Sequence, residues 1–221
     1  MKGSTTLFLQ NDKRMSESGS ASTDLSVRPG EQLEVIPGDI VESFSFAAIF
    51  ENDRPVEIDL GSGSGRFLTQ AACQYPERNF FGVERLLGRV RKTLRSASRL
   101  GLTNVRVLRL EIDYTVRFLL SPGSVSRLHL SFPDPWPKRR HSRRRLVDEG
   151  FLAASASALA IGGELWIKTD HADYFQRITK AVDSRKIFLF PCLGPKNTQG
   201  LILKKRIVPR MSRFISYVCE K

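Results

Sequence analysis

The densest group of chemically useful residues follows an apolar run that ends at Phe132. The segment Phe132-Pro-Asp134-Pro-Trp136-Pro-Lys138 places a proline after each of three residues. Because a residue that precedes proline is kept out of the helical region, this spacing predicts a stiff, extended turn that fixes the Asp134 carboxylate. A fixed carboxylate can stabilise positive charge that develops on a substrate, and Trp136 offers an apolar or stacking wall. The alternative is that Asp134 caps the next helix while Trp136 packs in the core.

A run of basic residues continues directly from this turn. Six of the eight residues from 138 to 145 are Lys or Arg, and a seventh is His141. Charged runs usually form solvated faces, but a run beside a candidate active site can anchor phosphates and set the register of a nucleic acid. The charge does not distinguish RNA from DNA. We predict phosphate contacts for Arg140, His141, Arg143, Arg144 and Arg145.

A glycine-rich segment earlier in the chain has the composition of a nucleoside-binding turn. The glycines of Asp59-Leu-Gly61-Ser-Gly63-Ser-Gly65 lie between an apolar run and a helical pattern, where the backbone must turn sharply and admit a ligand. About 20 residues later, Glu84 ends a second apolar run. A carboxylate at that position can accept hydrogen bonds from both hydroxyls of a bound ribose.

The spacing also bears on which nucleoside ligand binds. The pattern is G-x-G-x-G, whereas dinucleotide enzymes use G-x-G-x-x-G. S-adenosylmethionine has no pyrophosphate and carries a sulfonium and an ammonium, so acidic residues such as Asp59 suit it. We predict a site for S-adenosylmethionine at Asp59, Gly61, Gly63 and Glu84, with Glu111 near the adenine. The alternatives are a dinucleotide site, a turn without a ligand and, for Glu111, a solvated charge at the end of a strand.

Two later segments offer contacts to a nucleobase. Asp170 ends a fifth apolar run at the same expected edge of the sheet, and a carboxylate accepts hydrogen bonds from both N1–H and the exocyclic amine of guanine. A helix cap is the alternative role of Asp170. Thr198 lies in a loop with Gly and Pro, where it either contacts the base or stabilises the turn.

Short apolar runs that alternate with helical patterns predict the architecture that positions these residues. The alternation is typical of an α/β fold with a mostly parallel sheet, in which ligands bind at the carboxyl ends of the strands. Residues 85–100 carry an apolar stripe and predict a helix with a basic open side. The expected strands are Val56–Leu60, Asn79–Glu84, Val105–Leu110, Arg127–Phe132 and Glu164–Thr169, with Lys186–Phe190 and Arg213–Cys219 as late candidates, one of them antiparallel.

Composition narrows the class of protein. The chain has 221 residues and a formal net charge of +12, which indicates a polyanionic partner. No apolar run approaches the roughly 20 residues of a membrane-spanning helix, and the N-terminus lacks the apolar core of a secretory signal, so we expect a cytoplasmic protein. Residues 1–28 are rich in Ser, Thr and charge and predict a disordered tail, followed by one domain over residues 29–221. Neither a disulfide framework nor a metal site is indicated by Cys73, Cys192, Cys219, His129, His141 and His171.

These motifs together resemble those of the bacterial tRNA (guanine-N7-)-methyltransferase family. The resemblance covers about residues 55–174 and depends most on the string Phe-Pro-Asp-Pro-Trp-x-Lys-x-x-His, which begins here at Phe132. It implies a class I methyltransferase fold, Rossmann-like, with a mostly parallel seven-stranded sheet, helices on both faces and one antiparallel strand. It also implies S-adenosylmethionine as methyl donor and N7 of a guanine in the tRNA variable loop, at tRNA position 46, as the target.

The resemblance assigns roles to individual residues. Asp59, Glu84, Glu111 and Asp134 would line the donor site, and Asp134 would also be catalytic. Substrate contacts would come from Lys138, Asp170 and Thr198, and contacts to the RNA backbone from residues 140–145. Leu201 stands where the family has Glu, and Asp59 stands where many members have Glu. A monomer or homodimer without metal is expected, and methylation of another RNA or an inactive RNA-binding module are the alternatives.

Overall fold

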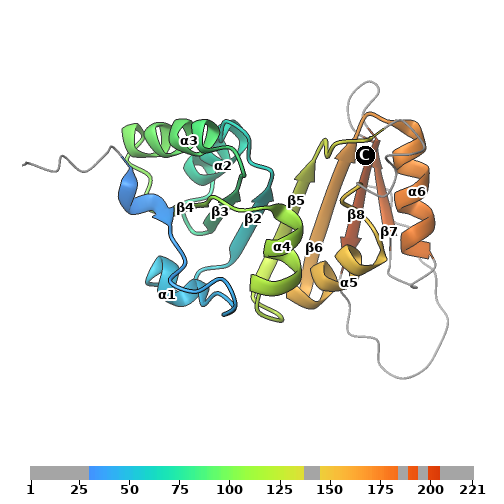
Figure 1. Cartoon of the computed structure of the whole chain (residues 1–221), viewed down its shortest axis with the longest axis horizontal. Helices are drawn as coiled ribbons and strands as arrows, with labels where there is room; N and C mark the ends of the chain where they lie inside the picture. The colour runs from blue at the N-terminus through green and yellow to red at the C-terminus, as the bar shows by residue number, and fades with distance from the viewer. Residues whose placement is uncertain (1–29, 137–144, 184–188, 194–198, 205–221) are drawn as a thin grey trace, which may run out of the picture.

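A single mixed sheet organises the part of the chain that the structure describes (Figure 1). The computed structural model describes residues 30–136, 145–183, 189–193 and 199–204. Within these residues the sheet has eight strands in the order β1-β4-β3-β2-β5-β6-β8-β7. Every neighbouring pair is parallel except the two that involve β8. The strands are β1 (Glu34–Val35), β2 (Val56–Leu60), β3 (Asn79–Val83), β4 (Val105–Leu108), β5 (Val125–Ser131), β6 (Leu159–Thr169), β7 (Leu189–Leu193) and β8 (Gln199–Lys204).

The predicted α/β sheet with one antiparallel strand is confirmed, and the five central strands lie where the apolar runs predict them. The described sheet has one strand more than predicted, because the two-residue β1 pairs with β4 at its edge. The antiparallel strand is β8, whose first two residues fall in a predicted loop. The late candidate Lys186–Phe190 overlaps only the start of β7, and Arg213–Cys219 lies outside the described residues, as does the predicted N-terminal tail.

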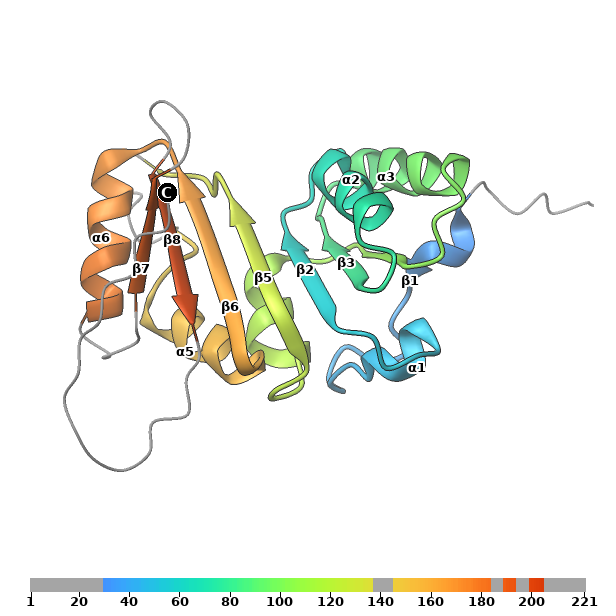
Figure 2. The same cartoon turned by 180° about the vertical axis from the view of Figure 1, so that it is seen from behind.

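Helices cover both faces of the sheet because alternate strand residues point to opposite sides. On one face, α2 (Arg66–Gln74) and α3 (Leu87–Arg99) pack on β3 and β4 through a cluster that includes Leu68, Leu94 and Phe80. The opposite face is covered by α1 (Phe46–Phe50), α4 (Ile112–Tyr114) with the π-helical turn η2 (Thr115–Leu119), α5 (Glu149–Ala158) and α6 (Ala172–Asp183). A 3-10 turn, η1 (Glu31–Leu33), precedes β1. Figure 2 shows the sheet from the side opposite to α4, α5 and α6.

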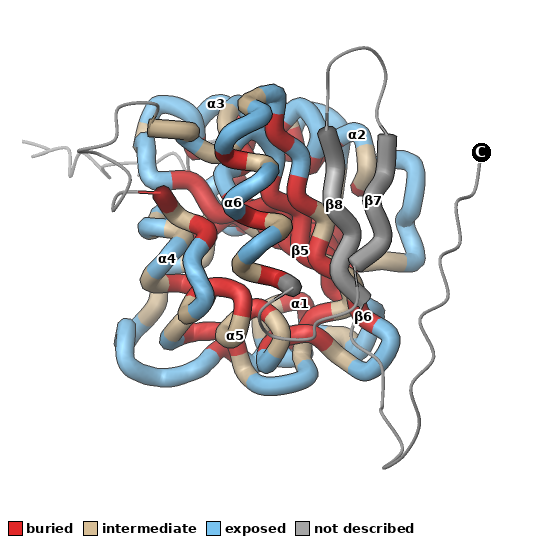
Figure 3. Tube along the Cα trace, turned by 90° about the vertical axis from the view of Figure 1, so that its right-hand side faces the viewer, coloured by how far each residue is buried: buried red, intermediate tan, exposed pale blue. Residues whose placement is uncertain are grey.

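The burial pattern follows this layering (Figure 3). All five residues of β2 are buried: Ile58 and Leu60 belong to the larger apolar cluster, whereas Glu57 and Asp59 point to the other face. The predicted basic helix is α3, which buries Val90, Leu94 and Ala97. The helix begins two residues later than predicted, and Leu86, inside the predicted range, is its exposed N-cap residue.

Two further observations concern only the described residues. None of their helices is long and apolar enough to cross a membrane. They also contain no group of three or more His, Cys, Asp or Glu side chains that could hold a metal ion.

Candidate active site

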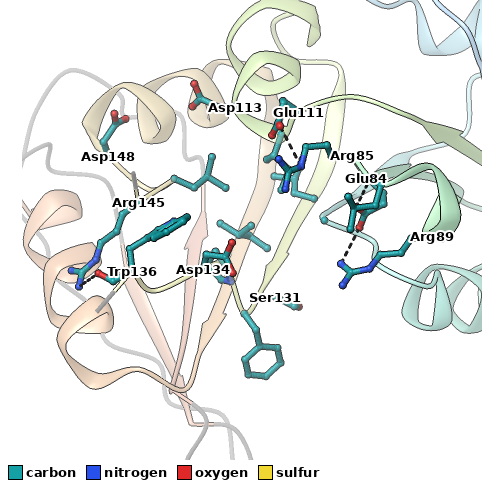
Figure 4. Close-up of a pocket in the computed structure, with 18 of the residues that line it drawn as sticks. Glu84, Arg85, Arg89, Glu111, Asp113, Ser131, Asp134, Trp136, Arg145 and Asp148 are labelled. Atoms are coloured by element: carbon teal, nitrogen blue, oxygen red, sulfur yellow. Dashed lines mark hydrogen bonds and ion pairs between the residues drawn. The ribbon is translucent and has the colours of Figure 1, made fainter. Parts of the chain in front are cut away.

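A cavity of about 540 Å³ opens at the carboxyl ends of β2, β3, β4 and β5 (Figure 4). Its lining includes Gly61 after β2, Glu84 after β3, Glu111 after β4, and Asp134 after β5. The structure therefore brings together four predicted site residues that come from four separate segments. The volume falls within the range of about 300–1,000 Å³ that small-molecule and cofactor sites occupy.

The glycine turn is shaped by its contacts with two neighbouring elements. Gly61 and Gly65 have φ values of 83° and 74°, a left-handed conformation that favours glycine. A Cβ atom on Gly65 would lie 2.3 Å from Thr93 Cγ2, so the turn packs directly against α3. The backbone N–H groups of Gly61 and Ser62 donate to the carbonyl of Val83 at 2.9 and 3.0 Å, which fastens the turn to the end of β3.

Glu84 is buried and is oriented by backbone donors. Its Oε2 accepts a hydrogen bond from Gly63 N–H at 3.0 Å, and its Oε1 accepts one from Leu86 N–H at 2.9 Å. Gly63 itself does not line the cavity, so its contact with Glu84 is the role that the structure gives it. Arg89 Nη1 lies 3.7 Å from Glu84 Oε2. An ionised carboxylate has about four acceptor positions, so Glu84 keeps capacity to accept bonds from a ligand.

Asp59 has a different environment, although it is also buried. Among the described residues no hydrogen bond or ion pair to its carboxylate is found. Burial, followed by the negative charge of Glu84, raises the pKa of Asp59 to about 7. Asp59 does not itself line the cavity, but it interacts with Glu84, which does, and two acidic groups that repel each other suit a ligand that carries positive charge.

The rim next to Glu84 is charged. Arg85 Nε lies 3.3 Å from Glu111 Oε1, and both side chains are more than half exposed. An exposed ion pair of this kind contributes little to stability, so Glu111 can exchange Arg85 for a ligand at small cost.

The turn that carries Asp134 is not extended at its ends. Phe132 and Trp136 have φ values of 55° and 40°, so the predicted extended conformation is wrong at both positions. Left-handed backbone is strained for such bulky residues, and it persists only where the surrounding contacts impose it. One such contact is the hydrogen bond from Phe132 N–H to the carbonyl of Lys168, 2.8 Å long.

Asp134 itself is exposed and lines the cavity. The alternative role as a helix cap does not hold for α5, because its N-cap is Asp148, which accepts from Phe151 N–H at 2.7 Å. Trp136 is partly exposed on the cavity wall rather than packed in the core. Both residues are thus available to a ligand.

Arg145 holds this turn from behind. Its Nε donates to the carbonyl of Pro135 at 2.6 Å, and its Nη2 lies 3.4 Å from the carbonyl of Trp136 and 2.8 Å from Asp173 Oδ2. The guanidinium also lies over the ring of Tyr174, 5.1 Å from its centroid. Only 5% of the side chain is exposed. The predicted phosphate contact of Arg145 does not fit this arrangement, because the side chain is buried and its guanidinium contacts protein groups.

The remaining predicted contacts are only partly visible. Asp170 is exposed at the end of β6 but does not line the cavity. The N–H of Tyr174, in the first turn of α6, is hydrogen-bonded to His171 Nδ1 rather than to Asp170. Lys138, Arg140, His141, Arg143, Arg144 and Thr198 lie outside the described residues.

Sequence reasoning missed one group on the cavity wall. Arg117 pairs with Asp113 at 2.7 Å and with Asp148 at 2.8 Å, and all three residues line the cavity. The spacing of Asp113 and Arg117, four residues apart, is a detectable signal for a helical ion pair. The contact with Asp148 depends on the tertiary fold and leaves no signal in the sequence.

Comparisons with known proteins agree with this geometry. The protein family described as "Putative methyltransferase" matches residues 53–209. A tRNA (guanine-N(7)-)-methyltransferase of Syntrophotalea carbinolica is 40% identical over 141 residues, which cover 64% of this chain and 61% of that protein. One of Macrococcus caseolyticus is 32% identical over 143 residues, covering 65% and 68%. The chain spans about three fifths of the length of the first two curated relatives, with 61% and 59% covered.

Solved structures show the same fold at low sequence identity. A S-adenosylmethionine-dependent methyltransferase from Aquifex aeolicus has a TM-score of 0.54 at 14% identity, covering 72% of this chain and 87% of that one. The antibiotic-resistance methyltransferase Kmr also has a TM-score of 0.54, at 17% identity, and covers 76% and 95%. These likenesses show that the sheet has the class I methyltransferase fold.

Proposed function

Because this chain belongs to the bacterial tRNA (guanine-N7-)-methyltransferase family, we propose that it transfers the methyl group of S-adenosylmethionine to N7 of a guanine in tRNA. The observation that carries the proposal is that Glu84 and Asp134, from the two halves of the sheet, line one cavity. The target that we propose is the variable-loop guanine at tRNA position 46, and the compartment is the cytoplasm.

The acidic residues suit this methyl donor. S-adenosylmethionine carries a sulfonium and an ammonium. The buried carboxylate of Asp59 lies near Glu84, has no hydrogen bond or ion pair within the described residues, and favours such charge. Glu84 would accept hydrogen bonds from the ribose hydroxyls, since its orientation is already fixed by Gly63 and Leu86. Gly61 would let the backbone approach the donor, and Glu111 would exchange Arg85 for the adenine edge.

The chemistry demands positioning rather than a base. Guanine N7 has a free lone pair at neutral pH, so the protein does not need to remove a proton. When bound, S-adenosylmethionine supplies a methyl group whose transfer to N7 moves positive charge from sulfur onto the purine. Asp134 would stabilise that charge where it develops, because its exposed carboxylate faces the cavity and has no partner among the described residues.

The base and the RNA backbone would be held by residues around the turn. Lys138, Asp170 and Thr198 are the proposed substrate contacts, and Arg140, His141, Arg143 and Arg144 the proposed phosphate contacts. Asp170 is the described member of this set, and it is exposed at the end of β6. Leu201 replaces the family Glu, so we propose that Asp170 carries most of the recognition of the guanine edge.

A methylation assay with an unmodified tRNA transcript and labelled donor tests the proposal. We expect the label at N7 of the variable-loop guanine, and none in a transcript whose variable-loop guanine is replaced by adenine. Asp134→Asn should bind donor and tRNA normally but lose about 100-fold or more in single-turnover rate, since it removes a charge that acts in the transition state.

Asp113→Asn is the matched control, because Asp113 lines the same cavity but is paired with Arg117. Its rate should stay within about threefold of the wild-type rate. Near-normal methylation by Asp134→Asn would refute the role of that carboxylate. Label on another nucleotide would contradict the proposed position, and absence of label with normal donor binding would favour a different RNA target. Failure of the wild-type protein to bind the donor in calorimetry would favour an inactive RNA-binding module.

A further inference from the structure

The exposed side of α3 is the most uniformly charged surface among the described helices. The segment from 85 to 99 contains six Arg or Lys residues and no acidic residue. All six are exposed: Arg85, Arg89, Arg91, Lys92, Arg95 and Arg99. Arg85 and Arg89 pair with Glu111 and Glu84 at the cavity. For the other four, no ion pair is found within the part of the chain that the structure describes.

This charge does not serve the helix. Lys92, Arg95 and Arg99 are three and four residues apart, a spacing at which like charges repel and weaken a helix. Arg89 lies in the first turn, where positive charge opposes the helix dipole, and the N-cap Leu86 makes no side-chain capping bond. The helix is held by its buried side, through residues such as Val90 and Leu94. A surface that breaks local rules without an internal benefit is expected to serve a binding function.

The geometry connects this surface to the candidate active site. Arg89, Lys92 and Arg99 fall on one side of α3, which rises 1.5 Å per residue, so they form a row about 15 Å long, and Arg85 precedes the helix at the cavity rim. The row begins at the cavity rim, where Figure 4 shows Arg85 and Arg89 beside Glu111 and Glu84. It then runs away from the cavity along α3.

We propose that this row of α3 binds the phosphate backbone of the RNA as the strand leaves the active site. The inference rests on the proposed function, because it takes tRNA as the ligand. It adds a second anchoring surface to the basic segment after Trp136. Arg85 and Arg89 would bind the strand at the cavity. The phosphates beyond the cavity would be bound by Lys92, Arg95 and Arg99.

Two double variants that remove the same charge test the proposal. Lys92→Gln/Arg95→Gln alters the basic row. Arg177→Gln/Lys180→Gln is the matched control, because it removes one Arg and one Lys at the same three-residue spacing from the exposed side of α6. Binding of an unmodified tRNA transcript is measured without donor over a range of salt concentrations. The α3 variant should bind about tenfold more weakly. The slope of log K against log salt concentration should become less negative by about 1 to 2.

The control should keep the wild-type salt dependence, and both variants should bind S-adenosylmethionine normally. Equal losses in the two variants would overturn the proposal, since the attraction would then follow net charge alone. An unchanged salt dependence in the α3 variant would overturn it as well. The α3 variant should also unfold at or above the wild-type temperature, because it relieves repulsion between like charges, and a lower temperature would contradict that account.

Failure of the proposed function would be seen separately. Wild-type protein that binds tRNA through this row without methylating N7 would disprove the enzymatic proposal and leave the binding surface standing. If the wild-type protein methylates N7 and the α3 variant binds tRNA as the wild type does, the enzymatic proposal stands and the binding surface is disproved.

Discussion

Glu57 and Asp59 lie two residues apart on β2, on the same side of the sheet, and both are buried. Their partners differ. Glu57 accepts hydrogen bonds from Arg78, from His129 Nε2 at 2.8 Å and from Arg127 Nη1 at 3.2 Å. Asp59 has no such partner among the described residues, and its charged neighbour is the carboxylate of Glu84.

The pKa values of the two groups diverge as a result. Burial alone would raise the pKa of Glu57, but hydrogen bonds from His129 and Arg78 and the charge of Arg127 lower it to about 2. Burial also lowers the pKa of His129, which is therefore a neutral donor at pH 7. At Asp59, burial and the charge of Glu84 act together and raise the pKa to about 7. The partners, rather than residue type or burial, thus separate a carboxylate that is bound within the fold from the one that we propose meets the charge of the donor.

The largest expected effect comes from Glu57. Glu57→Gln should lower the free energy of unfolding at pH 7.5 by about 3 kcal/mol, because it removes the buried counter-charge that Arg78 and Arg127 share and leaves them only Glu77 and Glu164. Affinity for S-adenosylmethionine should be unchanged, since the charge of Glu57 is neutralised by its own partners and Glu57 does not line the cavity. Denaturant unfolding and calorimetry measure the two quantities.

The stabilising effect of Glu57 should also depend on pH. Its pKa is depressed in the folded state, so the contribution is complete above the ordinary value of about 4.5 and disappears as the pH falls through about 2. The control is Glu77→Gln, which removes the exposed partner of Arg78 and should cost less than about 1 kcal/mol. If Glu57→Gln and Glu77→Gln lower the free energy of unfolding equally, the buried network of Glu57 is no more stabilising than the exposed pair of Glu77.

Much of this site could be predicted from the sequence because it depends on local rules. Short apolar runs predict the central strands, and in parallel sheets the strand ends meet at one edge, so the sequence predicts that the glycine turn, Glu84 and Asp134 converge. The turn after β5 was recognisable because prolines restrict their neighbours. Each of these signals acts within a few residues.

The rest depends on contacts that no local pattern contains. Arg145 looks like its neighbours in a basic run, but it turns inward because Asp173 and the ring of Tyr174, 28 and 29 residues later, accept its charge. The glycine pattern predicts a donor contact for Gly63 but not the hydrogen bond by which its N–H holds Glu84. The different pKa values of Glu57 and Asp59 also depend on the tertiary fold, which places Arg78, Arg127 and His129 beside Glu57.

A smaller effect is expected at Asp59. Asp59→Asn should weaken binding of S-adenosylmethionine at pH 8 by about tenfold to 30-fold, since it removes a negative charge near the cationic donor. It should also raise the free energy of unfolding at pH 8 by about 2 kcal/mol, because the variant no longer has to bury an ionised group. Glu57→Gln should instead leave donor affinity unchanged and lower the free energy of unfolding, and matching behaviour of the two variants would contradict the comparison.

The sign of the pH dependence sharpens this test. Between about pH 4 and 7, the folded protein keeps a proton on Asp59 that the unfolded chain has lost, so wild-type stability falls as the pH rises through this window. Above about pH 7 the contribution is constant, and Asp59→Asn should lack the slope altogether. Donor binding favours the ionised carboxylate, so wild-type affinity should increase as the pH rises towards 7. A flat affinity profile over this range would argue against Asp59 as the group that meets the donor charge.

The smallest expected effect concerns the same contrast at the turn after β5. Asp173 pairs with Arg145, which lowers the pKa of Asp173, whereas Asp134 is left without a partner among the described residues. Arg145→Gln should reduce kcat about tenfold, because the carbonyls of Pro135 and Trp136 lose the donor that fixes the Asp134 turn. Asp173→Asn weakens the same clamp from the surface and should reduce kcat about threefold.

The salt dependence of tRNA binding separates positioning from phosphate anchoring at Arg145. Arg145→Gln should keep the wild-type slope, because its buried guanidinium is not a phosphate contact, while Arg143→Gln, at a proposed phosphate contact, should flatten the slope by about 1. A flattened slope with unchanged kcat in Arg145→Gln would show that Arg145 contacts RNA phosphates and does not position the turn. It would also mean that Asp134 owes its position to the backbone of the turn alone.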